Sequence, residues 1–268
     1  MESGNETMFV YVVNKAKILR WALLGAAIVA AVVLLVVFFS GSRGADSQQT
    51  TLQSGRQLPV YRVAIEDKKV ALTFDAAWGE QHVTPILDEL DRFNIKCTFF
   101  IVGFWADQYP QTVREIAQRG HEVACHSTNH LHMASLTREQ MQADLTANCQ
   151  KLHSLTGREP MLFRPPFGEY NDTLIRVAAE EGMTAVQWSL DAYDWDGKTA
   201  DDIEKRIKKS IKPGDIVLMQ TNNVSVVGAL NRLIADLQAE GYQFVTVSEM
   251  LKTGETYVDK TGTQRARA

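Results

Sequence analysis

Short apolar runs alternate with amphipathic segments through residues 60–251, and this alternation constrains the fold more than any other feature of the chain. The runs contain few polar residues, which is typical of strands buried on both faces of a sheet. An alternation of this kind predicts one α/β domain with a parallel sheet, either doubly wound or closed into a barrel. The strands are expected at residues 69–74, 97–102, 122–124, 161–163, 184–188, 215–219 and 243–247.

The segments between these runs carry helix signals. Residues 137–155 place apolar side chains every three or four positions, and Thr137 and Gln140 form a capping-box pattern at the start. Thr199 is expected to cap a second, charged helix that begins near Ala200. No glycine-rich phosphate-binding motif follows the first strand, which argues against a nucleotide-binding domain.

A long apolar segment precedes the domain. Residues 21–39 contain no charged side chain, and nineteen helical residues span about 28 Å, close to the hydrocarbon thickness of a bilayer. Lys15, Lys17 and Arg20 precede the segment, so the positive-inside rule places residues 1–20 in the cytoplasm and the rest outside. We expect a single transmembrane helix that anchors the protein in the cell membrane. A cleaved signal peptide is the alternative.

Two further segments lack apolar periodicity. Residues 40–59 are rich in Gly, Ser and Gln and are expected to form a flexible stalk, while residues 253–268 are expected to form a disordered tail. The folded domain is therefore placed at residues 60–252. The 28 basic and 32 acidic residues nearly balance, so no nucleic-acid partner is expected, and we expect a monomer.

Three cysteines are too few, and odd in number, for a disulfide framework. Cys97 and Cys125 lie in strand-like runs, and Cys149 lies in a helical pattern. We expect free buried thiols at all three positions.

Polar residues with catalytic chemistry follow most of the expected strands. In a parallel α/β fold the carboxyl ends of the strands carry the functional loops, so these residues are expected to meet at one end of the sheet. They are Asp75 after the first strand, His126 and His130 after the third, Arg164 after the fourth, Asp191 and Asp194 after the fifth, and Gln220 after the sixth.

His126 and His130 have the spacing of paired metal ligands, since neutral imidazole is a common zinc ligand and paired histidines often lie three to five residues apart. In helix-like geometry they would share one face. The alternative is a solvated loop that is rich in histidine. Because the pair lies among other polar strand ends, the metal site is the favoured interpretation.

The order TFDAAWG, HSTNH, RPPFG, DAYDW and the strand end LMQ resembles the polysaccharide deacetylase family, also called the NodB-homology domain or carbohydrate esterase family 4. The resemblance covers residues 68–251 and is closest to a membrane-anchored, sporulation-associated branch. It implies a distorted (β/α) barrel with about seven parallel strands. It also implies removal of N-acetyl groups from amino sugars with a divalent metal, zinc or cobalt.

Carried onto this chain, the resemblance assigns roles to individual residues. His126 and His130 would bind the metal, Asp75 would be the general base, and Arg164 would orient that base. Asp194 would support the catalytic groups. Separately from the resemblance, sugar-stacking side chains are expected among Trp78, Trp105, Phe167, Tyr193 and Trp195, and those predicted to bind the substrate are Trp78, Phe167 and Trp195.

Two positions depart from the family pattern. Ala76 stands where the family has a metal-ligand aspartate, and Gln220 stands where it has the histidine that acts as general acid. An amide cannot transfer a proton at neutral pH. The expected function is a metal-dependent hydrolase that removes N-acetyl groups from peptidoglycan-type glycan on the outer face of the membrane. The alternative is a degenerate domain that binds glycan or a partner with little or no turnover.

Overall fold

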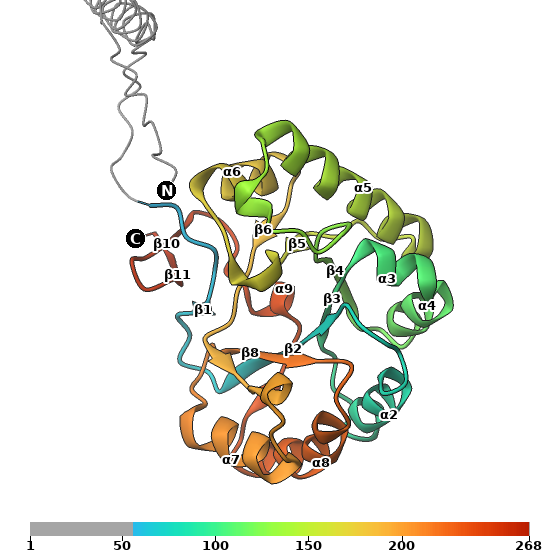
Figure 1. The fold of residues 1–268 in the computed structure, drawn as a ribbon. Helices are drawn as coiled ribbons and strands as arrows, with labels where there is room; N and C mark the ends of the chain where they lie inside the picture. Colours follow the sequence, from blue (N-terminus) through green and yellow to red (C-terminus); the bar gives the residue numbers. More distant parts are fainter. Residues whose placement is uncertain (1–55, 268) are drawn as a thin grey trace, which may run out of the picture. The chain divides into compact units, whose positions relative to one another are not determined.

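A parallel sheet forms the centre of the domain in the computed structural model, which describes residues 56–267 (Figure 1). Its strands follow the order β6-β5-β4-β3-β2-β8-β7, and β9 also pairs with β2. All seven expected strands are present, so the predicted parallel α/β domain is confirmed. The strands are β2 (Lys69–Ala76), β3 (Thr98–Ile101), β4 (Glu122–Cys125), β5 (Leu162–Phe163), β6 (Thr184–Ala185), β7 (Leu190–Asp191), β8 (Ile216–Gln220) and β9 (Gln243–Phe244).

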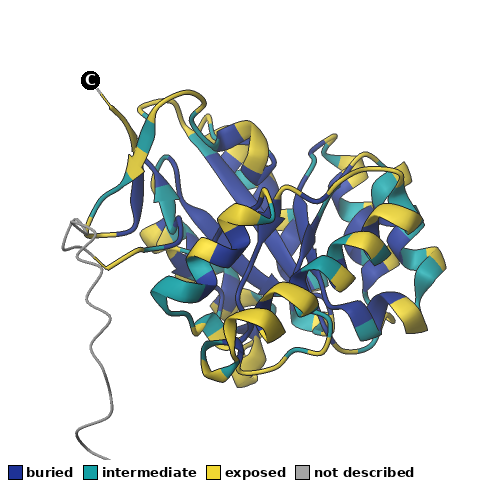
Figure 2. Cartoon of the chain, turned by 90° about the horizontal axis from the view of Figure 1, so that it is seen from above, coloured by how far each residue is buried: buried dark blue, intermediate teal, exposed yellow. Residues whose placement is uncertain are grey.

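Helices surround the sheet and turn their buried faces toward it (Figure 2). The predicted capping boxes are confirmed at Thr137 and Thr199, which begin α5 and α7. Gly157 ends α5 in the left-handed conformation, as a glycine C-cap does. The helices are α2 (Val83–Arg92), α3 (Gly103–Gln108), α4 (Pro110–Gln118), α5 (Arg138–Thr156), α6 (Asp172–Glu180), α7 (Ala200–Ser210), α8 (Val224–Ala239) and α9 (Val247–Met250); short 3-10 turns are η1 (Met133–Ser135), η2 (Pro166–Gly168) and η3 (Asp194–Asp196).

The sheet curves into an open barrel, and an extended segment links the chain after the edge strand β6 to the chain before β8. Val60 pairs with Val186, just after β6, and Arg62 pairs with Asp215, just before β8. Inward-facing side chains of alternate strand positions fill the space between, among them Ala71 and Phe100. The distorted barrel is therefore a half-barrel of parallel strands whose open side is covered by residues 60–63.

The predicted disordered tail is wrong. Residues 256–266 form β10 (Thr256–Val258) and β11 (Thr263–Ala266), and β11 pairs in parallel with β1 (Arg62–Val63). The turn between them is held by Asp259, whose carboxylate accepts hydrogen bonds from the backbone of Thr261 and Thr263. This short hairpin has no apolar periodicity of its own, and its partner strand lies at the other end of the domain in sequence.

The segments expected before the domain are outside the described residues. These are the cytoplasmic segment 1–20, the membrane anchor 21–39 and the stalk as far as residue 55. Among residues 56–267, none of the helices combines the length and the apolar character needed to span a bilayer.

Candidate active site

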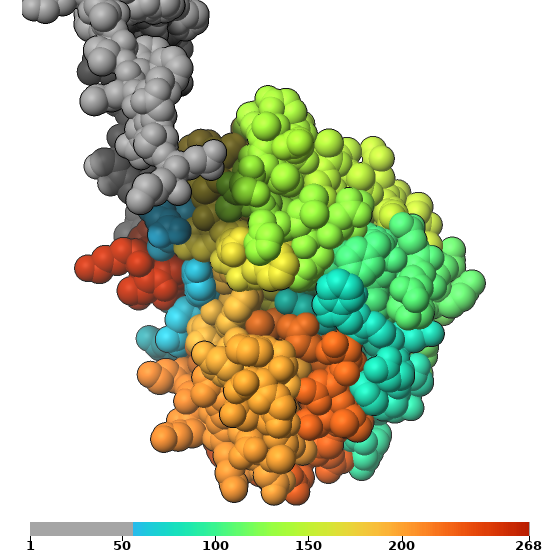
Figure 3. Space-filling model, viewed as in Figure 1, coloured from blue at the N-terminus to red at the C-terminus, as the bar shows by residue number. Residues whose placement is uncertain are grey.

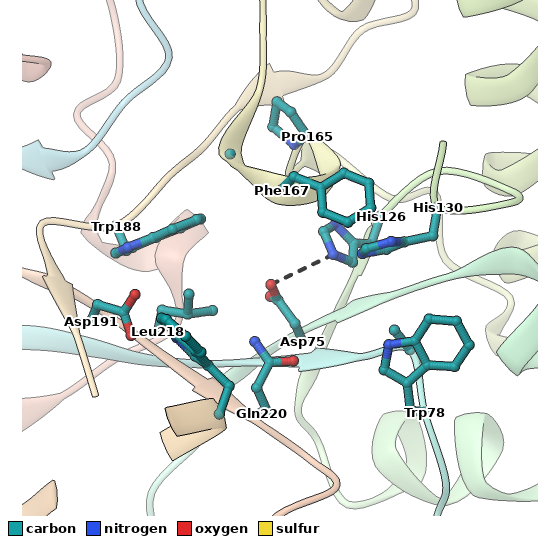
Figure 4. Close-up of a pocket in the computed structure, with 13 residues that line it drawn as sticks. Asp75, Trp78, His126, His130, Pro165, Phe167, Trp188, Asp191, Leu218 and Gln220 are labelled. Carbon is teal, nitrogen blue, oxygen red and sulfur yellow. Dashed lines mark ion pairs between the residues drawn. The ribbon is translucent and has the colours of Figure 1, made fainter. Parts of the chain in front are cut away.

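A cavity of about 390 Å³ lies at the carboxyl ends of the sheet strands (Figure 4). The chain segments that line it meet near the centre of one face of the molecule (Figure 3). Seven of the nine residues predicted for the site line this cavity, and Arg164 and Asp194 lie buried behind its wall. The seven are Asp75, Trp78, His126, His130, Phe167, Trp195 and Gln220.

Asp75 and Arg164 form a buried ion pair at the floor of the cavity. Arg164 Nη1 donates to Asp75 Oδ1 at 2.6 Å, and Arg164 Nη2 donates to Thr73 Oγ1 at 2.9 Å and to the Gln187 carbonyl at 3.1 Å. The guanidinium carbon also lies 3.9 Å from the centre of the Phe100 ring. Arg164 thus has one orientation, and it leaves Asp75 Oδ2 free to face the cavity.

Thr73 was missed in the sequence, although it is the one polar side chain between Lys69 and Asp75 in β2. Its hydroxyl donates to the Val217 carbonyl at 2.7 Å and accepts from Arg164. It therefore links β8 to the arginine that holds the candidate base.

The unprotonated ring nitrogen of His126 faces Asp75. Its Nδ1 lies 2.7 Å from the Arg164 carbonyl, which can only accept, so Nδ1 carries the proton. Burial lowers the pKa of His126, so the imidazole is neutral and Nε2 has a lone pair. That nitrogen lies 3.5 Å from Asp75 Oδ2. Two acceptors therefore face each other, an arrangement that a shared cation stabilises.

His130 approaches His126 through a turn and not through a helix. The backbone of Ser127 has φ 69° and that of His130 has φ 51°, so the helix-like geometry considered for this segment is wrong. The Ser127 hydroxyl accepts from the backbone N–H of Asn129 and His130 and holds the turn. The two imidazole rings come within 5.0 Å between centroids, and burial with the neighbouring His126 lowers the pKa of His130 to about 4.

Helix α5 supports this turn from behind. Asp144 Oδ1 accepts from the Thr128 backbone N–H at 2.9 Å, and Oδ2 accepts from the Ser127 hydroxyl at 3.3 Å. Sequence reasoning missed Asp144. The sequence does offer a sign of its role, because Asp144 is an acidic residue of α5 that lies between Met141 and Leu145, two of the apolar positions that face the core.

Gln220 lines the opposite wall, and Asp194 lies buried behind it. Asp194 Oδ2 accepts from the Gln220 backbone N–H at 2.9 Å, while the Gln220 side chain points into the cavity beside Asp75 (Figure 4). Burial raises the pKa of Asp194 to about 6. Asp194 therefore shapes the end of β8 without contacting the cavity.

Aromatic side chains surround the opening. Trp78, Phe167 and Trp195 are 57 %, 54 % and 59 % exposed, so their faces are available to a ligand. Phe167 packs edge-on against His130, and Trp188, which sequence reasoning placed inside a strand, lines the cavity as well. Trp105 is buried and belongs to the core. An open, aromatic rim of this kind suits a sugar ring.

The residues present fit the metal that the family resemblance implies only in part. His126 and His130 are neutral imidazoles beside the Asp75 carboxylate, and this donor type suits zinc. Ala76, however, is buried in the apolar core at the end of β2 and supplies no donor. Among residues 56–267, no three or more His, Cys, Asp and Glu side chains are grouped so as to hold a metal ion. The site therefore has two histidines and a shared carboxylate in place of three dedicated ligands.

Comparisons with known proteins agree with the family resemblance of the sequence. The polysaccharide deacetylase family model matches residues 62–186. A peptidoglycan-N-acetylglucosamine deacetylase of Bacillus cereus is 34 % identical over 197 residues, which cover 72 % of this chain and 92 % of the relative.

Two solved structures share the fold. One is a carbohydrate esterase family 4 pseudoenzyme of Bacillus anthracis, 30 % identical, with a TM-score of 0.70 over 72 % of this chain and 68 % of that chain. The other is a mutant of that pseudoenzyme with restored enzymatic activity, 31 % identical, with a TM-score of 0.70 over 72 % of this chain and 70 % of that one. From the matched motifs, the fold and the Bacillus cereus relative together, this chain belongs to the polysaccharide deacetylase family, in carbohydrate esterase family 4.

Proposed function

We propose that this chain is a metal-dependent N-deacetylase that releases acetate from N-acetylated, peptidoglycan-type amino sugars. The Asp75–Arg164 ion pair beside two neutral histidines, in a cavity with an aromatic rim, is the observation that carries the proposal. The Bacillus cereus relative, named as a peptidoglycan deacetylase, supports the choice of substrate. Anchoring by residues 21–39, with the domain on the outer face of the membrane, is part of the same proposal.

Asp75 is the base in this reaction. Its Oδ1 is fixed by Arg164, and its Oδ2 faces the cavity, where it accepts the proton of the attacking water. A divalent cation held by His126 and His130 supplies polarisation of the acetyl carbonyl and a lower pKa for water when it is bound. If Asp75 instead serves as a third ligand, it is no longer free to act as a base.

Gln220 limits the rate. It lies where a proton donor to the leaving amine is needed, and it donates a hydrogen bond but no proton. The loss of a general acid commonly costs about 10²–10⁴ in rate, so slow turnover is expected.

The second candidate function is glycan binding without turnover. Ala76 and Gln220 favour it, and so does the similarity to a structure described as a pseudoenzyme. The aromatic rim would then hold the sugar while the interior of the site stays inactive.

One experiment separates the two functions. Purified full-length chain is assayed for bound metal and for acetate release from N-acetylated peptidoglycan, alongside His126→Ala, Gln220→His and the double variant Ala76→Asp/Gln220→His. We expect metal-dependent acetate release by the native chain, its loss in His126→Ala, and a gain of about 10- to 10³-fold in Gln220→His.

A matched control places the new histidine outside the cavity. Asn222→His changes an exposed residue two positions beyond Gln220, in the turn that follows β8, and should leave the rate unchanged. If only the double variant releases acetate, the native chain is a binding domain and the enzymatic proposal is wrong.

A further inference from the structure

Two cysteines meet directly behind the histidine turn. Cys125 is the last residue of β4 and precedes His126, and Cys149 lies on α5. Their sulfur atoms are 2.9 Å apart. A disulfide bond has an S–S distance of about 2.05 Å, so the two thiols are within about 1 Å of bonding distance. All three cysteines are free thiols, as expected, although Cys149 is only partly buried, and the fold brings two of them together.

The two thiols differ in access. Cys149 is partly exposed on the wall of a second cavity of about 450 Å³, which opens between α5 and residues 159–161 and is separate from the candidate active site. Cys125 is fully buried behind it and does not line this cavity. A reagent from solution therefore meets Cys149 first.

We propose that Cys149 and Cys125 form a redox-active dithiol that reacts with an external disulfide through the cavity beside α5. The Cys149 thiolate attacks one sulfur of the reagent RSSR, forms a mixed disulfide and releases RS⁻. Cys125 then attacks the Cys149 sulfur, closes the Cys125–Cys149 bond and releases the second RS⁻. The two protons of the cysteines go to the two thiolates, so the sum is two Cys–SH plus RSSR giving one internal disulfide and two RSH.

The internal bond would act on the histidine turn. Helix α5 already holds this turn through Asp144, and the disulfide would add a covalent link between the same helix and the residue before His126. Closing a loop of this size typically stabilises a domain, and we expect the oxidised protein to melt about 5–10 °C higher than the reduced protein.

Cys97 provides an internal control. It is fully buried and directly precedes β3, and no contact with another thiol is found for it within the described residues. It should stay reduced under conditions that oxidise the other two.

The test uses the full chain incubated with oxidised glutathione. Remaining thiols are alkylated, and the proteolytic peptides are mapped by mass. We expect a Cys125–Cys149 cross-link that lacks two hydrogens and an alkylated Cys97. Cys149→Ser should leave Cys125 as an alkylatable thiol, and Cys125→Ser should stop at the Cys149–glutathione mixed disulfide.

Three results would overturn the proposal: a persistent mixed disulfide at Cys149 in the native chain, a cross-link that includes Cys97, or no reaction at Cys149. Cys149→Ser changes a partly exposed residue, so its fold is expected to survive even if Cys125→Ser is unstable. The melting temperature of each species, read before and after reduction, gives a second measurement that does not depend on enzymatic activity.

Discussion

Asp194 shows how a single buried carboxylate couples the site to pH. Its pKa of about 6 results from burial, with smaller contributions from the nearby Asp191 and Asp75 charges, against a usual value of 3.8. Because the folded-state pKa is above the unfolded value, the contribution of this group to stability is full below pH 3.8. It is lost as the pH rises through about 6.

The comparison of the native chain with Asp194→Asn isolates this effect. The amide keeps the shape and an acceptor for the Gln220 N–H, but it does not titrate. We expect the stability of the native chain, relative to the variant, to fall by roughly 1–3 kcal/mol between pH 4 and pH 7. Denaturant unfolding of both proteins at several pH values in this range measures the difference between their free energies of unfolding. A difference that does not change with pH would show that Asp194 stays ionised when folded.

Most site residues could be predicted from the sequence because each follows an apolar run. Asp75, His126, Arg164 and Gln220 all satisfy that rule. Thr73 does not, since its role depends on which face of β2 meets Arg164, and that depends on the order of the strands. Residue patterns indicate where each strand ends, but they do not indicate which strands lie next to each other in the sheet.

At the scale of elements, α5 is the support for the histidine turn. Asp144 accepts from the Thr128 N–H and the Ser127 hydroxyl, and the Asp144 carbonyl accepts from the Thr128 hydroxyl at 2.8 Å. Ser127 and His130 have positive φ, so the turn depends on these bonds to hold a conformation that non-glycine residues rarely adopt.

Asp144→Ala should therefore loosen the turn. We expect a loss of about 1–3 kcal/mol in stability, because buried N–H and hydroxyl groups lose their acceptor, and a loss of about 10- to 100-fold in metal affinity. Asp144→Asn keeps one acceptor and should lose less. Gln150→Ala, at an exposed position of the same helix, is the control. Equal metal affinity in Asp144→Ala and the native chain would contradict this role.

The elements themselves were predictable in proportion to their length and burial. The strand at β2 and the helix at α5 have clear periods and caps, and both were expected close to their observed bounds. The strand β7 was missed because its two residues, Leu190 and Asp191, do not form an apolar run of their own. Leu190 and Asp191 form a strand because they pair with β8, and their local sequence does not indicate one.

At the scale of the whole molecule, the closure of the half-barrel depends on both ends of the domain. The backbone of Tyr61 donates to the Gly262 carbonyl, and that of Ala64 donates to the Gln264 carbonyl. The same N-terminal segment pairs with the chain after β6, where Gln187 N–H donates to the Val60 carbonyl at 2.8 Å. The hairpin at residues 256–266 thus holds the segment that covers the open side of the sheet.

The closure of the half-barrel is connected to the active site through Gln187. The Gln187 carbonyl accepts from Arg164, which holds Asp75. Deletion of residues 253–268 should release residues 60–63, which cover the open side of the sheet. We expect the free energy of unfolding to fall by about 2–5 kcal/mol, because Val60 and Val63 become more exposed. The Gln187 carbonyl, which accepts from Arg164, should also be held less firmly.

We therefore expect the deletion variant to bind glycan nearly as well as the full chain but to release acetate more slowly, even well below its melting temperature. Arg267→Ala, which changes only an exposed side chain, is the control for stability and rate. Thermal melting and acetate release, measured together, distinguish the possibilities. An unchanged rate in a destabilised variant would mean that the Asp75–Arg164 pair keeps its geometry without the closure, and that the hairpin serves stability alone.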